Sequence, residues 1–172
     1  VQAVIIPIQQ HKEGVLDKAE EIANQLKAVG VRVKIDDSEN SPGWKFAEYE
    51  MKGVPVRIEI GPKDIENNKC VAATRYNGAK RDVMLDDVVD AVLDMLGKEI
   101  PEGMFNKALE NREKHTYSCT TMDEIVAALE QNGDGFVKAM WCGEEECEDK
   151  VKEVTGVGSR CIPFNQEEIA PT

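Results

Sequence analysis

The sequence lacks the motifs that mark most enzyme active sites. Its 172 residues contain no G-x-G-x-x-G, no P-loop, no G-x-S-x-G and no H-E-x-x-H pattern. This argues against dinucleotide binding, P-loop phosphate binding, serine hydrolysis and zinc proteolysis. The only two histidines, His11 and His115, lie far apart in the sequence, and we expect both on the surface. We therefore expect no catalytic residue in this chain.

Long apolar runs and a leader sequence are also missing. No stretch approaches the roughly 18 apolar residues that a membrane span needs. The start, VQAVIIPIQQ, has no basic lead and no cleavage site, so we expect no signal peptide. It begins without Met and inside an apolar run, which indicates a piece of a longer protein. Five irregularly spaced cysteines fit a reducing compartment, and we expect a cytoplasmic location.

Positive charge is scarce and unevenly spread. The chain has 21 Lys and Arg against 33 Asp and Glu, for a net charge of -12. Residues 44–81 carry 8 basic and 5 acidic side chains, whereas residues 82–172 carry 8 basic and 21 acidic ones. A local basic face on an acidic body can still bind a polyanion, because salt confines its field to about 10 Å. The segment 44–81 is therefore the candidate contact for nucleic acid.

The hydrophobic pattern over residues 1–100 alternates between strands and helices. The run at 1–8 is typical of a strand buried on both faces, and the apolar stripe over 14–29 predicts a helix. Asn77-Gly78 predicts a hairpin turn. We expect further strands at 31–35, 54–60, 69–76 and 80–84, and further helices at 43–52 and 86–96. This order describes an α/β domain over residues 1–100, with a mixed open sheet flanked by helices.

The remaining residues, 101–172, predict a connector helix followed by a small α+β domain. We expect helices at 102–117, 122–131 and 144–155, and strands at 136–141 and 159–164. Thr120 or Thr121 is expected to cap the second helix, with Glu124 nearby. To be stable, a unit of about 50 residues needs a cross-link such as a bound metal ion, or a neighbouring domain to pack against.

Three cysteines in this second domain could bind a stabilising metal ion. Cys142 and Cys147 are separated by four residues in WCGEEECEDK, which is close to common zinc-ligand spacings. Cys161 lies in the last predicted strand, so the set is one ligand short of a tetrahedral zinc site. Free buried thiols are the alternative. We assign Cys142 and Cys147 to an incomplete zinc site.

The stretch 42–64 carries the densest functional signal. Its predicted helix and strand together hold aromatic, basic and acidic side chains: Trp44, Lys45, Phe46, Tyr49, Glu50, Arg57 and Glu59. Rings that stack on bases, cations for phosphates and an acid for base edges are what recognition of single-stranded RNA needs. The alternative is an amphipathic helix whose aromatic residues pack into a core beside an ordinary strand.

The chain also resembles a known family. The segment PGWKFAEYEMKGVPVRIEIGPKDI looks like the C-terminal anticodon-binding domain of class IIa aminoacyl-tRNA synthetases, in its details the prolyl-tRNA synthetase family of the archaeal/eukaryotic type. The likeness extends through VQAVIIPI, VRVKIDD and LDDVVDAVLDML. It continues into GFVKAMWCGEEECEDKVKEVTG and SRCIPF, which look like that family's extra C-terminal domain.

The resemblance implies that one group of residues reads the tRNA anticodon. The matching positions are Phe46, Glu50, Arg57, Asp64 and Lys80. Phe46 would pack near an anticodon base, and Glu50 and Arg57 would read the guanines of a proline anticodon. A carboxylate can accept from guanine N1–H and N2–H, and Arg can donate to O6 and N7. Of Arg57 and Glu59, we expect only one to share a face with Glu50, and we choose Arg57.

The resemblance also implies a larger parent enzyme that ligates proline to tRNA. Its catalytic domain, with ATP and Mg²⁺, would precede Val1, and the parent would be a homodimer through that domain. The family's second cysteine pair has no counterpart before Thr172, which puts zinc in doubt here. We expect the anticodon loop of proline tRNA as the partner, and neither DNA nor a membrane. Two alternatives stay open: the anticodon domain of another class IIa synthetase, or a small α/β module that binds a nucleotide or a protein.

Overall fold

A computed structural model describes residues 1–165 of the chain. It divides into two compact units, Val1–Asn106 and Lys107–Thr172, which are described separately here. Helix α5 (Ile100–Lys114) crosses the boundary between them. No helix among residues 1–165 is long and apolar enough to span a membrane.

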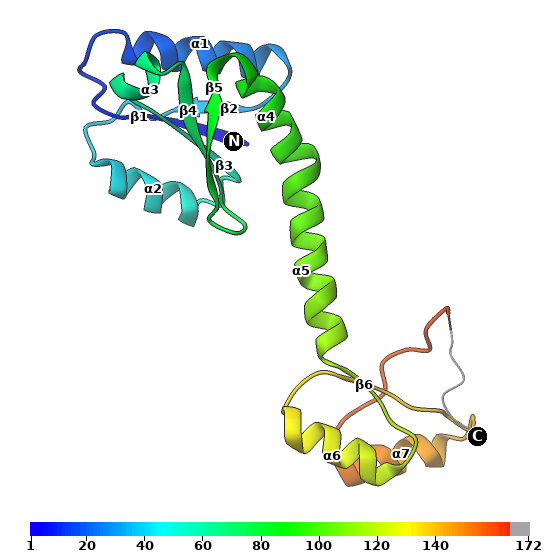
Figure 1. The fold of residues 1–172 in the computed structure, drawn as a ribbon. Coiled ribbons are helices and arrows are strands. Elements are labelled where there is room, and N and C mark those ends of the chain that lie inside the picture. The colour runs from blue at the N-terminus through cyan, green and yellow to red at the C-terminus, as the bar shows by residue number, and fades with distance from the viewer. Residues whose placement is uncertain (166–172) are drawn as a thin grey trace. The chain divides into compact units, whose positions relative to one another are not determined.

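The first unit is built on a mixed, five-stranded sheet (Figure 1). Its strands lie in the order β2 (Val33–Ile35), β1 (Ala3–Pro7), β3 (Val56–Ile60), β4 (Lys69–Thr74) and β5 (Lys80–Met84). β1 runs parallel to its neighbours β2 and β3. β4 runs antiparallel to its neighbours β3 and β5. The expected mixed open sheet and the Asn77-Gly78 hairpin are therefore confirmed.

One face of this sheet is covered by helices α1 (Val15–Ala28) and α4 (Val88–Asp94). Alternate strand residues such as Ile5, Ile58 and Ala72 point into this core, where they meet Leu26 and Val92 from the helices. All five residues of β1 are buried, which is the expected pattern for a strand packed on both faces. Burial of these apolar side chains is the main source of the unit's stability.

The opposite face is covered only in part, by helix α2 (Pro42–Met51). Figure 1 shows α1 and α2 on opposite sides of the sheet. Val4, Ile6, Tyr49 and Val54 form a small second core beneath α2, with Ile8 and Phe46 packed against it. On β3, by contrast, Arg57 and Glu59 face this side between the buried residues of the main core. The sequence of β3 thus gives an apolar face to the core and a charged face to the surface next to α2.

Two helical segments differ from the sequence prediction. A short helix, α3 (Pro62–Glu66), follows β3 and was not predicted, because its five residues are too few to show a helical period. The predicted helices at 86–96 and 102–117 join into one continuous stretch: η1 (Leu85–Asp87), α4, the π-helical turn η2 (Met95–Glu99) and α5. Helix α5 ends at Lys114, and residues 116–118 are extended.

The second unit has two short parallel strands and two helices. Strand β6 (Thr116–Ser118) pairs with β7 (Phe136–Lys138), and helix α6 (Met122–Asn132) connects them. Helix α7 (Glu145–Thr155) follows. The predicted cap of α6 is confirmed, because the Thr121 hydroxyl accepts from Glu124 N–H at 3.3 Å, and Glu124 in turn accepts from Thr120.

One predicted strand of this unit is wrong. Residues 159–164 form no strand, and Ile162 and Phe164 are exposed. The apolar pattern at these positions is strand-like, but Pro163 has no N–H to donate to a ladder. Among the described residues of this unit, only Cys119 and Ile125 are buried apolar side chains.

Candidate nucleic-acid interface

Helix α2 begins at a well-defined cap. Ser41 precedes it in an extended conformation and accepts from the Trp44 N–H at 3.4 Å, while Pro42 occupies the first turn. Ser at the cap and Pro in the first turn are both favoured there, because Ser satisfies a free N–H and Pro has none to satisfy. The cap fixes where α2 starts, and therefore which of its side chains face the sheet.

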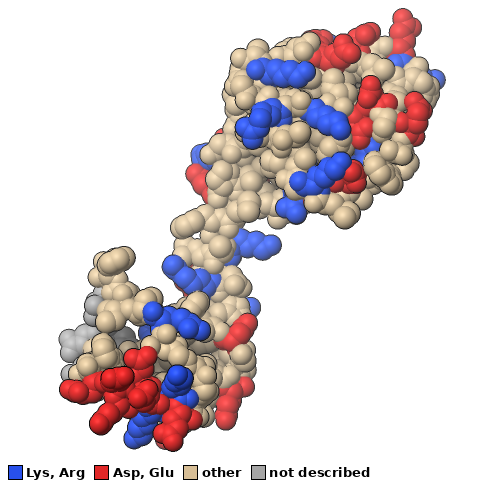
Figure 2. Space-filling view, turned by 180° about the vertical axis from the view of Figure 1, so that it is seen from behind, with Lys and Arg blue, Asp and Glu red and all other residues tan. Residues whose placement is uncertain are grey.

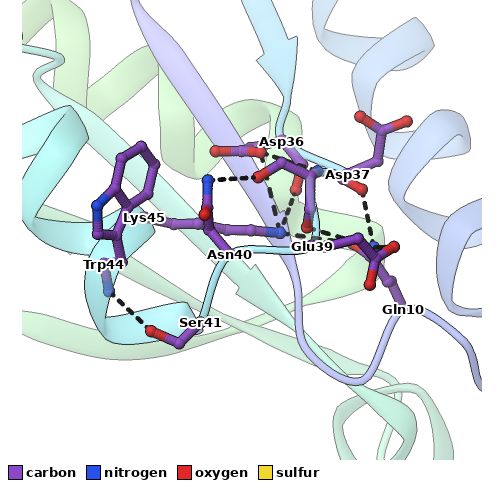
Figure 3. Close-up of polar contacts among 9 residues, drawn as sticks. Gln10, Asp36, Asp37, Glu39, Asn40, Ser41, Trp44 and Lys45 are labelled. Atoms are coloured by element: carbon purple, nitrogen blue, oxygen red, sulfur yellow. Dashed lines mark hydrogen bonds and ion pairs between the residues drawn. The ribbon is translucent and has the colours of Figure 1, made fainter.

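Lys45 anchors this helix to the ends of two strands (Figure 3). Its side chain is buried, and its Nζ donates to the Asp36 carbonyl oxygen at 2.9 Å and to Gln10 Oε1 at 3.4 Å. The Asp36 carboxylate lies 3.9 Å from the same Nζ. Lys45 was expected to be a cation for RNA phosphates, and this was wrong: its charge is used inside the protein. Tyr49 is likewise a core residue and is 4% exposed.

Asp36 completes this polar cluster at the carboxyl ends of β1 and β2. Its Oδ1 accepts from the Ser38 N–H at 3.0 Å, and Gln10 donates to the backbone of Asp37 and Ser38. Burial opposes ionisation of Asp36, but the Ser38 hydrogen bonds and the Lys45 charge outweigh it and lower the pKa of this carboxyl. The loop after β2 is thereby held against the first turn of α2.

Four of the five predicted anticodon-reading residues meet at the other end of α2. The Arg57 guanidinium carbon lies 4.1 Å from the centre of the Phe46 ring, and Arg57 Nη1 donates to Glu50 Oε1 at 2.9 Å. Lys80 Nζ lies 5.1 Å from the same ring centre. The helix supplies the ring and one acid, and strands β3 and β5 supply the two cations.

Glu59 is a further member of this cluster. Its Oε1 accepts from Arg57 Nε at 3.1 Å and from Lys80 Nζ at 2.8 Å. The expectation that only one of Arg57 and Glu59 shares a face with Glu50 was therefore wrong. Residues two apart on a strand point to the same face, so the alternation of the strand places both of them there.

Asp64, the fifth predicted residue, has a different local role. It is the third residue of α3, and its Oδ2 accepts from the Gly61 N–H at 2.9 Å, which caps that short helix. None of the hydrogen bonds or ion pairs of residues 1–165 links Asp64 to the cluster of Phe46, Glu50, Arg57 and Lys80. The structure therefore places it beyond the carboxyl end of β3 as a capping residue.

Small residues of β4 leave room for these side chains to meet across the sheet. Ala73 pairs with both Arg57 and Lys80 in the strand register, and Val71 pairs with Glu59 and Asp82. Because Ala73 and Val71 are short, side chains from β3 and β5 can reach each other above them. Figure 2 shows several Lys and Arg side chains on one face of the first unit with Asp and Glu along its edge, and a cluster of Asp and Glu with some Lys and Arg on the second unit.

The two predicted zinc ligands of the second unit lie within hydrogen-bonding reach of each other. A hydrogen bond between the thiols of Cys142 and Cys147 raises the pKa of Cys147. Cys161, however, is exposed, and residues 1–165 hold no group of three or more His, Cys, Asp or Glu side chains arranged to bind a metal ion. Two thiols are half of the four ligands that a structural zinc site requires.

Comparison with protein families gives two matches that together cover most of the chain. Residues 2–95 match the model of the anticodon binding domain, and residues 122–172 match the model of the prolyl-tRNA synthetase C-terminal domain. The first match contains the whole five-stranded sheet and the Arg57 cluster. The second contains α6, β7 and α7.

Curated relatives of the chain carry one name. A protein of Clostridium botulinum named proline–tRNA ligase is 54% identical over 171 residues, 99% of this chain. Proteins of the same name from Clostridium novyi and Ruminiclostridium cellulolyticum are 53% and 52% identical over 169 residues, 98% of this chain. In each case the match spans 35% of the relative's length, so the chain corresponds to about a third of these proteins.

Proposed function

The chain belongs to the anticodon-binding domain family, joined to a prolyl-tRNA synthetase C-terminal domain, and from this premise we propose that it binds the anticodon loop of proline tRNA through the Arg57 cluster. The observation that carries the proposal is the meeting of Phe46, Glu50, Arg57 and Lys80 on the face of the sheet that helix α2 covers only in part. This is the chemistry that unstacked bases require: planar groups to stack on, and donors and acceptors beside them.

Each side chain of the cluster has a distinct part in this proposal. The Phe46 ring supports the Arg57 guanidinium, whose N–H groups would donate to guanine O6 and N7. Glu50, whose side chain is 58% exposed, can leave Arg57 and accept from guanine N1–H and N2–H. Lys80 adds positive charge beside the loop phosphates.

The alternative of a nucleotide-binding module receives less support. In open α/β sheets, nucleotides bind at the carboxyl ends of parallel strands. Here the ends of β1 and β2 are occupied by the buried Lys45, Asp36 and Gln10 cluster. The cavity lined by Ala72, Met95 and Glu99 measures about 50 Å³, which is small against the roughly 300 Å³ or more of most ligand pockets.

About two thirds of the relatives' length lies outside this chain, and for that part the proposal rests on family membership alone. We propose that the longer protein ligates proline to tRNA with ATP and Mg²⁺ bound outside this chain, as a cytoplasmic homodimer formed through that other part. This chain would then select the tRNA without taking part in the chemistry. Asp64, which caps α3 beyond the carboxyl end of β3, is proposed as a separate contact for the loop.

Binding of the 172-residue chain to two RNA transcripts tests the proposal. One is a proline tRNA, and the other has both anticodon guanines replaced. We expect weak binding that prefers the first transcript and falls with salt, because Lys and Arg contacts release counterions from the phosphates. Arg57→Ala should lower the preference about tenfold without removing the part that Glu50 contributes, whereas Arg32→Ala, which removes an exposed charge outside the cluster, should keep it. Equal binding of both transcripts by the unchanged chain would refute base reading.

A further inference from the structure

We infer that Glu59 is a positioning residue for anticodon reading, which holds Arg57 and Lys80 on the Phe46 ring without contacting the RNA itself. The inference rests on the proposed function. Glu59 lies in the family-like segment quoted above, but it is not among the five expected anticodon-reading residues. Its role follows from where its carboxylate lies, which side chains it binds and how little of it is exposed.

A single oxygen of Glu59 links the two cations. Oε1 accepts from Arg57 Nε at 3.1 Å and from Lys80 Nζ at 2.8 Å. Arg57 is thereby held by Nε, the donor nearest the side-chain stem, while its Nη1 donates to Glu50. Of the five guanidinium donors, the contacts among residues 1–165 use one on Nε and one on Nη1. The hydrogen bonds among these residues give the remaining Nη hydrogens no protein acceptor.

Burial separates the roles of the two acids. The side chain of Glu59 is 14% exposed, whereas that of Glu50 is 58% exposed. Both bind Arg57, but Glu59 is enclosed by the cluster and Glu50 lies at its rim. A ligand can therefore exchange places with Glu50 without disturbing Glu59. The enclosed acid has the location of a support, and the exposed acid has the location of a reader.

Electrostatics explains why the support must be negative. Arg57 and Lys80 approach one aromatic ring, at 4.1 and 5.1 Å from its centre, so their charges repel each other. Cation–π attraction by one Phe is modest against such repulsion in a partly buried site. The carboxylate between the two cations offsets that repulsion. Without it, the flexible and half-exposed Lys80 would turn towards solvent.

The test compares Glu59→Gln with Asp82→Asn in the full 172-residue chain. Both changes remove one negative charge from the same face of the sheet, since Glu59 and Asp82 pair with Val71 from its two sides. Asp82 binds Lys69 rather than Arg57 or Lys80. Binding is measured with the two transcripts described above, at a temperature where circular dichroism shows all variants folded.

We expect Glu59→Gln to lower the preference for the proline anticodon about fivefold or more, the scale of one base contact. Asp82→Asn should keep the preference within about twofold, while both variants gain similarly in affinity for the replaced transcript because each is less negative. In an Arg57→Ala/Lys80→Ala background, adding Glu59→Gln should have no further effect on the preference. This absence of effect is the signature of a residue that acts through the two cations.

Two results would overturn the inference while leaving the proposed function intact. One is an unchanged preference in Glu59→Gln when the unchanged chain discriminates normally. The other is a further loss in the Arg57→Ala/Lys80→Ala background, which would place Glu59 in direct contact with RNA. If the unchanged chain shows no preference, the proposed function itself fails. NMR then still tests the geometry: the Arg57 Nε–H signal should be protected from solvent exchange in the unchanged chain and lose that protection in Glu59→Gln.

Discussion

The central carbon of the Arg57 guanidinium lies over the Phe46 ring, 4.1 Å from the ring centre. This pairing joins strand β3 to helix α2 on the face of the sheet that α2 covers only in part. Phe46 is half-buried against the small core of Val4, Ile6, Tyr49 and Val54, so one side of the ring is fixed by packing. The other side carries the cation. A stacked Arg is thus part of the folded domain before any RNA arrives.

Phe46→Leu separates the stacking role of the ring from its packing role. Leucine keeps most of the apolar contact with the small core but removes the π face under Arg57. We expect affinity for the proline transcript to fall about tenfold, because stacking contacts contribute about 1–3 kcal/mol per base. The loss of stability should stay near 1 kcal/mol.

Trp44→Leu is the matched control for this change. Trp44 is on the same helix and is 51% exposed, but it does not touch the Arg57 cluster in the contacts of residues 1–165. Binding by fluorescence anisotropy with labelled RNA should show little change for Trp44→Leu. Equal losses for both variants would mean that α2 as a whole, rather than the Phe46 stack, determines binding.

Glu50→Gln tests the proposed reader of guanine. The amide keeps the size of the side chain but replaces one acceptor with a donor, which opposes guanine N1–H and N2–H. We expect discrimination against the transcript with replaced guanines to fall by about 1–3 kcal/mol, as for one polar base contact. Folding stability should change little, since the Glu50 side chain is 58% exposed and exposed ion pairs contribute about 0–1 kcal/mol. Glu48→Gln, on the same helix, is the control, and discrimination that survives Glu50→Gln would remove Glu50 from the site.

The Tyr76 ring packs against Gly103 at the start of α5, and this contact predicts a stability difference between two glycines. A Cβ on Gly103 would lie 2.5 Å from Tyr76 Cε2, whereas a Cβ on Gly97 would meet nothing within 4 Å. Gly103→Ala should therefore destabilise the first unit by about 1–3 kcal/mol through the steric clash. Gly97→Ala should be neutral or stabilising by up to about 1 kcal/mol, because Ala is the better helix former. Urea unfolding of both variants checks this, and equal stabilities would show that the Tyr76 contact is not tight.

The fold could be predicted from local patterns because they agree with one another. The apolar run of β1, the stripe of α1 and the Asn77-Gly78 turn each indicated the element that the structure contains. The secondary-structure predictions failed where strand pairing or the length of an element determines the structure. Residues 159–164 have a strand-like pattern without a strand partner, and α3 is too short for a periodic signal. Neither pairing nor a single helical turn can be read from hydrophobic period alone.

The site was only partly predictable for a related reason. The family pattern led to Phe46, Glu50, Arg57 and Lys80, which the structure brings together. It did not lead to Glu59, although strand alternation places that residue beside Arg57. Lys45 looked like a surface cation because lysine is rarely buried. Its burial depends on oxygen atoms of Gln10 and Asp36, which are distant in sequence and meet only in the folded sheet.

The depressed pKa of Asp36 makes a specific prediction about stability and pH. Because the pKa of this carboxyl is lower in the folded chain than its ordinary value of 3.8, the folded state favours the ionised form. The stabilisation is present above pH 3.8 and is lost as the pH falls through the lower, folded pKa. Asp36→Asn removes this contribution, and at pH 7 it should lower the free energy of unfolding by about 1–3 kcal/mol.

The difference between the unchanged chain and Asp36→Asn should therefore be constant from about pH 7 to pH 5 and shrink below pH 4. Asp37→Asn is the control, because Asp37 is exposed and only its backbone oxygen is used by Gln10. Urea unfolding at several pH values measures both differences. A stability difference for Asp36→Asn that is unchanged down to pH 2 would show that the charge of Asp36 does not contribute, and that Lys45 is held by the backbone carbonyl and Gln10 alone.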